Sequence, residues 1–221
     1  MFTKKTTRKL LITSGCSWTA GSSKIHQKYV WPIILAKKLD MESVNVGNGG
    51  RGNEFIYSSL IDKLCTSKNI GLTICMWSDF DRLDFFDRTV LTYPNFRSGE
   101  FNNLYKSIRY IQAFQNHCEL NKIPFLQTQG INPTQECNKE FLDSAQFDLI
   151  NSKRFIGWPI YKELGGRTMW HELDKVDPEQ VKLRVSKDDL HPNEQGHEYI
   201  AEIIYKHYRE LYENSIRKSK R

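Results

Sequence analysis

The sequence contains no long apolar run, and this absence argues against a membrane-spanning helix. Over its 221 residues no stretch approaches the ~20 apolar residues that a membrane-spanning helix needs. Several basic residues precede the apolar run "LLIT", which imitates a signal peptide. That run is shorter than the roughly 7–15 residues of a secretory core. We therefore expect a cytoplasmic protein with no export signal.

Paired cysteines are also missing. The five cysteines are odd in number and none has CxxC spacing, so the sequence indicates neither a disulfide framework nor a zinc cluster. We expect reduced thiols throughout. Cys65, Cys75 and Cys118 lie in apolar runs, which places them in the core. The other two are Cys16 and Cys137.

Acidic residues are absent from both ends of the chain, and the ends account for the positive charge. The formal net charge is +6, but residues 1–9 and 217–221 hold eight of the 32 basic side chains, leaving 24 against 26 acidic ones. A nucleic-acid groove would need its lysines and arginines on the folded body. No repeat or low-complexity linker divides the chain. We expect two basic tails, a single domain over residues 10–216 and no specific nucleic-acid partner.

What the sequence does contain is an alternation of strands and helices. Short apolar runs that end in small residues predict strands, and apolar residues at helical spacing predict helices. The expected strands are 9–14, 43–48, 70–77 and 123–129, and the expected helices are 29–40, 53–67, 102–122 and 192–215. We therefore expect a three-layer α/β/α sandwich, flavodoxin-like, with about five parallel strands. Residues 132–187 give no readable pattern.

Turns of small residues follow three of the expected strands, at Gly15, at Gly47 to Gly52 and at Ser78. Ligands of parallel α/β sheets bind at the carboxyl ends of the strands, near a switch in strand order. These turns should therefore converge on one edge of the sheet.

A thiol and a hydroxyl stand side by side in the first of these turns, as Cys16 and Ser17. Near the other end, Asp188 and His191 lie three residues apart, immediately before Pro192. A carboxylate can hold an imidazole in one tautomer and stabilise its charged form, as an acid–base histidine requires. The alternative is a helix-capping aspartate beside a surface histidine.

Two motifs together resemble a known family. "GCSWTAG", followed far downstream by "DDLHPNEQGH", resembles the SGNH (GDSL-like) hydrolases, and especially a branch whose first motif reads Gly-Cys-Ser-Phe-Thr-x-Gly. The Trp-Pro and Leu-Ala pairs of that branch are matched by "WPIILA", and its glycine turn by "NVGNGG". The matches span residues 10–56 and 185–203, with a weaker one at 74–86.

The resemblance implies a role for each matching residue. Ser17 matches the nucleophile, His191 the general base and Asp188 the orienting carboxylate, with Asp189 as the nearby competitor. Gly50 matches the glycine whose backbone N–H joins that of Ser17 in the oxyanion hole. Cys16 then supports the turn, and Ser17 is the reactive group.

The third family motif, Gly-x-Asn-Asp, aligns with residues 76–79, and here the sequence departs from the pattern. Ser78 stands where the family has the asparagine that donates its side-chain amide to the oxyanion. A hydroxyl can donate one hydrogen bond, although its reach is shorter. Asn53, just after the glycine turn, is a second candidate for that donor.

Three other features have ordinary explanations. "TMWHELD" lacks the second histidine of a zinc-protease motif and is interpreted as a solvated or substrate-lining turn. His197 is expected on the closing helix, in packing or capping. "WSDFDRLDFFDR" is expected to form a loop or helix with internal ion pairs, with metal binding as the alternative. Its charged residues are Asp79, Asp81, Arg82, Asp84, Asp87 and Arg88.

The resemblance implies a serine esterase that acts on a small-molecule or carbohydrate ester, for example an acetyl group on a sugar. This chemistry needs no metal and no organic cofactor. Two alternatives stay open. An acyltransferase would use the same residues with a sugar hydroxyl as acceptor, bound in a groove from residues 80–100 and 130–180. A catalytically weakened binding or structural protein would retain only the fold.

Overall fold

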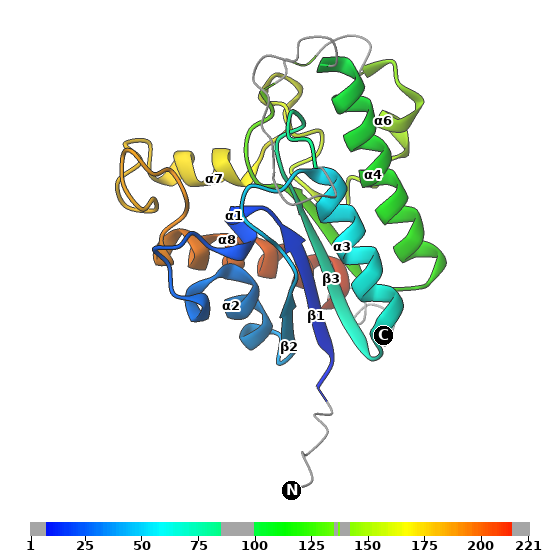
Figure 1. Cartoon of the computed structure of the whole chain (residues 1–221), viewed down its shortest axis with the longest axis horizontal. Coiled ribbons are helices and arrows are strands. Elements are labelled where there is room, and N and C mark those ends of the chain that lie inside the picture. Colours follow the sequence, from blue (N-terminus) through cyan, green and yellow to red (C-terminus); the bar gives the residue numbers. More distant parts are fainter. Residues whose placement is uncertain (1–7, 85–99, 135–136, 138–141, 214–221) are drawn as a thin grey trace, which may run out of the picture.

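The computed structural model describes residues 8–84, 100–134, 137 and 142–213. Its centre is a sheet of five parallel strands in the order β2-β1-β3-β4-β5 (Figure 1). Apart from Arg8 and Lys9, the two expected basic tails lie outside the described residues. The strands are β1 Leu10–Gly15, β2 Glu42–Asn45, β3 Ile70–Trp77, β4 Phe125–Gln129 and β5 Phe155–Ile156.

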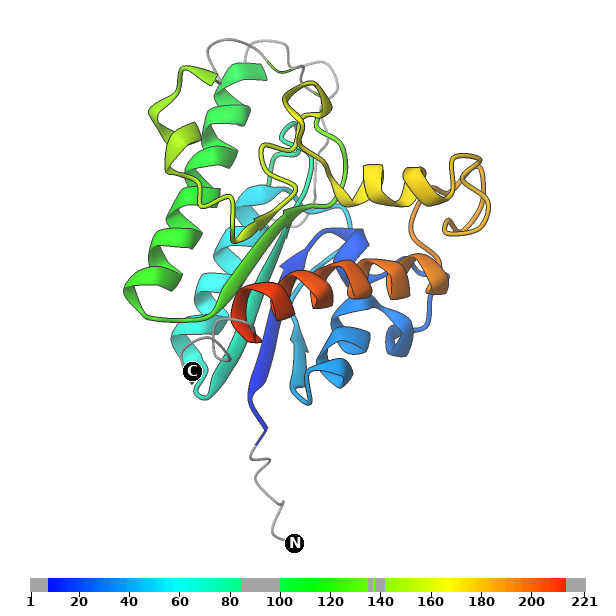
Figure 2. The ribbon, with the colours of Figure 1, turned by 180° about the vertical axis from the view of Figure 1, so that it is seen from behind.

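Helices cover both faces of the sheet. α3 and α4 pack on the face seen in Figure 1, and α8 crosses the opposite face in the view from behind (Figure 2). The longer helices are α2 Trp31–Lys38, α3 Asn53–Thr66, α4 Glu100–Leu120, α7 Met169–Val176 and α8 Glu194–Tyr208. Shorter ones are α1 Ser17–Ala20, η1 Gln27–Tyr29, α6 Ala145–Leu149, η3 Lys162–Leu164 and η4 Arg209–Glu213.

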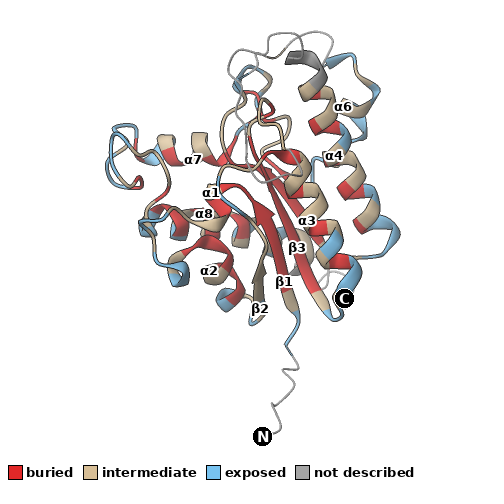
Figure 3. Cartoon of the chain, in the orientation of Figure 1, coloured by how far each residue is buried: buried red, intermediate tan, exposed pale blue. Residues whose placement is uncertain are grey.

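Alternation along the strands divides the buried residues into two cores. Ile12 faces the core under α3 and α4, whereas its neighbour Leu11 faces the core under α2 and α8. Trp77 and Met76 divide in the same way at the end of β3. Figure 3 shows the resulting pattern, with buried residues along the strands and on the helix faces that meet them. The expected three-layer α/β/α sandwich is confirmed.

Most of the predicted elements are present, and the differences fall in short segments. β5 has only two residues, which is too short to give a periodic signal. "TMWHELD" is not a turn, because α7 begins at Met169 with Thr168 as its N-cap. Cys75 and Cys118 are buried as expected, whereas Cys65 is exposed near the end of α3, so its assignment to the core was wrong.

The strand order creates a crevice at the carboxyl edge of the sheet. After β1 the chain adds β2 on one side and then β3 on the other, so the strand order switches at β1. The segments that leave β1 and β3 at this edge diverge toward opposite layers, which opens the space between them. Ser17 follows β1 and Ser78 follows β3, so both expected site segments lie here.

The loop between α7 and α8 is held by a buried carboxylate. Asp177, 2 % exposed, accepts hydrogen bonds from the backbone N–H groups of Val181, Lys182 and Leu183. It thereby fixes the start of the segment that leads to His191. None of the described helices combines the length and the apolar character needed to cross a bilayer.

Replacing Asp177 by alanine should lower the free energy of unfolding by about 1–3 kcal/mol, because buried N–H groups would lose their acceptor. Urea denaturation measures the change. Glu179→Ala is the matched control, since Glu179 lies in the same segment but is exposed. Equal stability of the Asp177 variant and the control would contradict a structural role for this carboxylate.

Candidate active site

The turn after β1 presents Ser17 and buries Cys16. Cys16 is the N-cap of α1 and has no exposed surface, whereas Ser17, the first residue of that helix, is half-buried. Gly15 allows this sharp turn, because a Cβ there would fall 2.1 Å from Thr19 Oγ1 and 2.9 Å from the Met76 carbonyl oxygen. The hydroxyl rather than the thiol is therefore accessible to a ligand.

Ser17 and His191 meet although 174 residues separate them in the chain. The Ser17 Oγ and the His191 Nε2 lie 2.8 Å apart, and the other ring nitrogen, Nδ1, lies 2.6 Å from Asp189 Oδ1. Since the carboxylate can only accept, Nδ1 carries the ring proton and Nε2 accepts from the serine hydroxyl. This is the hydrogen-bonding pattern of a Ser-His-Asp triad.

The acid of this triad is Asp189, so the expectation that Asp188 contacts the imidazole was wrong. Asp188 is exposed. The Asp189 N–H donates to Ser186, which closes a tight turn. In this turn the Asp189 side chain faces the His191 ring. The backbone N–H of His191 then donates to Asp189 Oδ1 at 3.3 Å, an Asx-type bond that binds the two residues together.

The environment of Asp189 favours its ionised form. Its second oxygen, Oδ2, pairs with the Lys24 ammonium at 3.1 Å. The hydrogen bond from His191 lowers the pKa of Asp189 to about 2, with a smaller contribution from Lys24. A carboxylate that stays ionised can orient the imidazole and stabilise its protonated form.

Ser17 and His191 line a cavity of about 370 Å³. Its apolar lining residues are Trp18, Ile131, Trp170 and Leu190. Its other polar lining residues are Asp79, Arg82 and Asn132. A cavity with an apolar wall and a few polar side chains near a nucleophile is typical of a small-molecule site.

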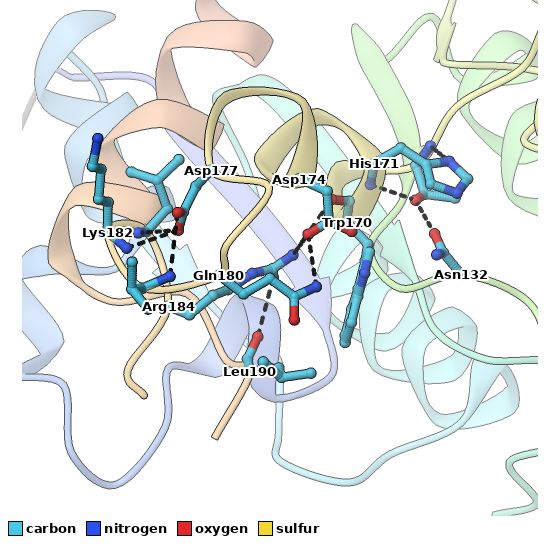
Figure 4. Close-up of polar contacts among 12 residues, drawn as sticks. Asn132, Trp170, His171, Asp174, Asp177, Gln180, Lys182, Arg184 and Leu190 are labelled. Atoms are coloured by element: carbon cyan, nitrogen blue, oxygen red, sulfur yellow. Dashed lines mark hydrogen bonds and ion pairs between the residues drawn. The ribbon is translucent and has the colours of Figure 1, made fainter. Parts of the chain in front are cut away.

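A buried arginine connects the cavity wall to the triad loop (Figure 4). The side chain of Arg184 has no exposed surface, and its Nη2 pairs with Asp174 Oδ1 at 2.8 Å. Its Nη1 donates to the carbonyl oxygen of Leu190, the residue before His191, at 3.0 Å. The guanidinium carbon also lies 4.9 Å and 4.6 Å from the ring centroids of Trp18 and Trp170.

His197 is buried and does not line the cavity. It has no exposed surface, and its Nδ1 accepts a hydrogen bond from the Trp31 N–H at 3.4 Å. Burial lowers the pKa of His197 to about 4, with a smaller effect from the nearby His191, so the ring is neutral at neutral pH. The expected packing role is confirmed.

Two of the expected oxyanion-hole donors are backbone groups. Ser17 begins α1, so its N–H belongs to the first turn, where amides have no acceptor within the helix. Gly50 lies in the glycine turn beside the end of β1, where the Asn48 N–H donates to the carbonyl oxygen of Gly15 at 3.0 Å. The turn is therefore held next to the strand that delivers Ser17.

Of the expected oxyanion-hole residues, only Ser17 lines the cavity; Gly50, Asn53 and Ser78 do not. The Ser78 hydroxyl is buried and has no hydrogen-bond partner among the described residues. Asn53 Nδ2 donates to the Ser78 carbonyl oxygen at 3.2 Å and to Ser107 Oγ at 3.0 Å. Its Oδ1 accepts from the Ser78 N–H at 2.8 Å, so this amide braces the end of β3. The expectation that Asn53 is free to donate to a substrate was wrong.

The acidic segment after β3 forms a loop held by polar contacts with other segments. Asp79 accepts hydrogen bonds from the backbone and hydroxyl of Thr134. Asp84 accepts from the N–H groups of Gly52 and Phe55. The described parts of the chain contain no group of three or more His, Cys, Asp or Glu that could hold a metal ion. Asp87 and Arg88, two residues of the expected ion-paired segment, lie outside the described residues.

Sequence analysis missed Arg184, and it included Trp170 only within a segment interpreted as a solvated or substrate-lining turn. The sequence contains a start signal for α7, because Thr168 and His171 form a capping box. The third helix position of this box holds histidine rather than the usual Glu or Gln. Burial lowers the pKa of His171, and its ring serves as a cap. Nothing in the local sequence marks Arg184, because its partners come from separate segments.

Comparison with solved structures supports the fold assignment. The chain is similar to a protein assigned to the lipolytic G-D-S-L family from Desulfitobacterium hafniense DCB-2, with 16% identity and a TM-score of 0.57 over 90% of this chain and 99% of that one. It is also similar to the psychrotrophic esterase EstA from Pseudoalteromonas sp., with 12% identity and a TM-score of 0.54 over 91% and 97% of the two chains. No protein-family model and no curated protein matches the chain.

A third similar structure is a carbohydrate esterase family 2 enzyme with a carbohydrate-binding domain, from Corynascus thermopiles. Its identity is 12% and its TM-score 0.54, over 95% of this chain and 68% of that one. At these identities the likeness concerns the fold. The chain therefore has the three-layer fold of SGNH (GDSL-like) hydrolases, as its sequence motifs predicted.

The low pKa of Asp189 predicts a pH-dependent contribution to stability. Its folded pKa, about 2, lies below the ordinary value of 3.8, so the unfolded chain binds the proton more tightly. The carboxylate therefore stabilises the fold above about pH 4, and this contribution is lost as the pH falls through about 2.

Urea denaturation should show that Asp189→Asn is less stable than wild type at neutral pH and that the difference shrinks in acid. Asp188→Asn is the control and should follow wild type at every pH, because Asp188 is exposed. A difference between Asp189→Asn and wild type that stays constant down to the lowest pH at which both are folded would contradict the assignment.

Proposed function

We propose that this protein is a serine esterase of the SGNH type. The observation that carries the proposal is the chain of contacts from Ser17 Oγ to His191 Nε2, 2.8 Å, and from His191 Nδ1 to Asp189 Oδ1, 2.6 Å. Ser17 and His191 line a cavity large enough for a small ester. Ser17 lies 174 positions from His191 in the chain, so local sequence alone does not bring the hydroxyl to the imidazole.

In the first half of the reaction, Ser17 Oγ attacks the ester carbonyl carbon and its proton passes to His191 Nε2. The carbonyl π electrons move to oxygen, and Asp189 stabilises the imidazolium. The C–O bond to the alcohol then breaks, and His191 returns the proton to the leaving oxygen. The product of this half-reaction is an acyl-Ser17 ester and a free alcohol.

In the second half, a water molecule attacks the acyl carbon while His191 takes one of its protons. The tetrahedral intermediate collapses, the bond to Ser17 Oγ breaks and the proton is delivered to the serine oxygen. The acid is released and the free enzyme is restored. None of these steps needs a group from outside the chain except water.

A short acyl group on a carbohydrate is the substrate that the cavity suits best. Trp170 offers an aromatic surface, and Arg82 and Asn132 offer hydrogen bonds, a combination that suits the apolar faces and hydroxyls of a sugar. The carbohydrate esterase among the similar structures is in keeping with this substrate class. Transfer of the acyl group to a sugar hydroxyl would use the same residues, and free acid and acylated sugar measured together distinguish the two outcomes.

One observation favours a second candidate, a binding protein that retains the fold. Ser78 replaces the family asparagine, and its hydroxyl is buried and does not line the cavity. Loss of one oxyanion donor lowers turnover by about 10²–10³-fold in other enzymes. A wild-type protein that binds acetylated sugars but neither hydrolyses them nor reacts with a fluorophosphonate would establish this second function instead.

Replacing Ser17 by alanine should lower kcat for p-nitrophenyl acetate by about 10⁴–10⁶-fold and abolish fluorophosphonate labelling, because the attacking oxygen is lost. Cys16→Ala is the matched control and should keep most of the activity, since its thiol is buried. Activity in Ser17→Ala that thiol reagents then block would overturn the assignment of the nucleophile.

The two adjacent aspartates should differ sharply in kinetics. Asp189→Asn should lower kcat by about 10²–10⁴-fold, because an amide can hold the imidazole in the wrong tautomer and cannot stabilise its charge. Asp188→Asn should leave kcat within about twofold of wild type, since Asp188 is exposed. The reverse order of effects would show that the triad forms with Asp188 in solution.

A further inference from the structure

The candidate active site lacks the side-chain donor that an SGNH-type oxyanion hole uses. The hydroxyl of Ser78 is buried outside the cavity, and the amide of Asn53 is engaged with Ser78 and Ser107. Two backbone N–H groups, from Ser17 and Gly50, are the remaining donors among the expected ones. The proposed esterase would therefore need another group to match the charge that develops on the carbonyl oxygen.

Arg82 is the candidate for such a group. It lines the same cavity as Ser17 and His191. Its Nη1 donates a long hydrogen bond, 3.5 Å, to the carbonyl oxygen of Arg51, the residue after Gly50. The guanidinium therefore reaches the glycine turn that provides one of the backbone donors.

The segment that carries Arg82 is fixed on both sides. On one side, Asp79 accepts hydrogen bonds from the N–H and the hydroxyl of Thr134. On the other, Asp84 accepts from the Gly52 N–H at 2.9 Å and from the Phe55 N–H at 2.8 Å, at the start of α3. Arg82 is thus held between two anchored residues, as a positioned catalytic group must be.

The backbone of this segment also packs tightly on the glycine turn. A Cβ on Gly52 would fall 2.5 Å from the carbonyl oxygen of Arg82. The absence of a side chain at Gly52 therefore lets the segment approach the turn that contains Gly50. The two parts of the proposed oxyanion hole are in direct contact through this residue.

The charge of Arg82 is not neutralised within the described part of the chain, where no carboxylate forms an ion pair with it. An arginine side chain has five N–H donors and remains protonated at any pH that an enzyme meets. One donor binds the Arg51 carbonyl oxygen, and the side chain carries four others. Hydrogen bonds from a charged donor to an oxyanion are roughly twice as strong as neutral ones.

We propose that Arg82 is a catalytic residue that donates a hydrogen bond to the oxyanion, together with the backbone N–H groups of Ser17 and Gly50. It takes the part that the third-motif asparagine plays in the family, from a position four residues after Ser78. The inference rests on the proposed esterase function. It assigns to Arg82 a contact that strengthens in the transition state, and hence an effect on kcat.

Asn132 is the alternative donor in the cavity. Its Oδ1 accepts a hydrogen bond from Thr168 Oγ1 at 2.5 Å, which leaves its amide N–H groups available. It follows β4, however, and β3 separates that strand from β1 and Ser17. Arg82 follows β3 itself, the immediate neighbour of β1, and contacts the Gly50 turn. Position therefore favours Arg82.

The test measures kcat and KM for an uncharged ester, p-nitrophenyl acetate, in wild type, Arg82→Gln, Arg82→Lys and Asn132→Ala. Arg82→Gln should lower kcat by about 10²–10³-fold with little change in KM. The kcat of Arg82→Lys should lie between those of wild type and Arg82→Gln, because lysine keeps the charge but not the forked geometry. Arg109→Gln, which removes an exposed arginine on α4, is the matched control for charge and should leave kcat and KM unchanged.

Chemical rescue separates a catalytic contact from a structural one. Millimolar ethylguanidinium should restore part of the kcat of Arg82→Ala and leave wild type unchanged. Circular dichroism and urea denaturation should show that the variants are folded. Loss of stability without rescue would overturn the inference and make Arg82 a structural residue.

Other outcomes overturn the inference in distinct ways. Unchanged kcat in Arg82→Gln, with a raised KM only for esters that carry a carboxylate, would make Arg82 a binding site for substrate anions. A kcat loss in Asn132→Ala but not in Arg82→Gln would move the donor to Asn132. A wild type that neither turns over esters nor labels at Ser17 would overturn the proposed function, and this inference with it.

Discussion

The site depends on one topological constraint, the position of β1 between β2 and β3. Because the chain adds strands first on one side of β1 and then on the other, the segments that leave β1 and β3 diverge at the carboxyl edge. Ser17 follows β1, Arg82 follows β3, and both line the cavity. The last helix, α8, crosses the sheet and brings the loop before it, with His191, to the same edge (Figure 2). Residues from distant parts of the chain meet there because the strand order leaves the space.

A buried charge holds the opening in shape. Removing a guanidinium from water is costly, and contacts with Asp174, the Leu190 carbonyl oxygen and the two tryptophan rings offset part of that cost for Arg184. These partners come from α1, α7 and the loop before α8. The arginine therefore joins segments that lie apart in the sequence. Apolar packing could bury the same area, but it would not fix the orientation of the Leu190 carbonyl group, which is next to His191. The arginine thus links the cavity wall to the orientation of the triad.

The fold and the two ends of the triad could be predicted from the sequence, because each depends on local patterns. The strand-to-turn change at Ser17 and the helix start after His191 are both visible in short segments. The choice between Asp188 and Asp189 could not be made, since the two acids have the same chemistry and only the turn closed by Ser186 separates them. Residues 132–187 were unreadable because they are held by long-range contacts such as those of Arg184, which leave no periodicity.

Ser78 shows that a residue aligned with a family motif need not perform the chemistry of that motif. The alignment places Ser78 where the family has a donor, yet its hydroxyl points into the protein while its backbone N–H and carbonyl oxygen bind Asn53. Asn53 thus serves to fix the end of β3, and that fixed end carries the loop to Arg82. A donor lost at one position can therefore be supplied by another residue of the same loop, provided that the loop is anchored. Substituting the motif residue need not abolish the chemistry, because the oxyanion is recognised by where a donor lies and not by its place in the alignment.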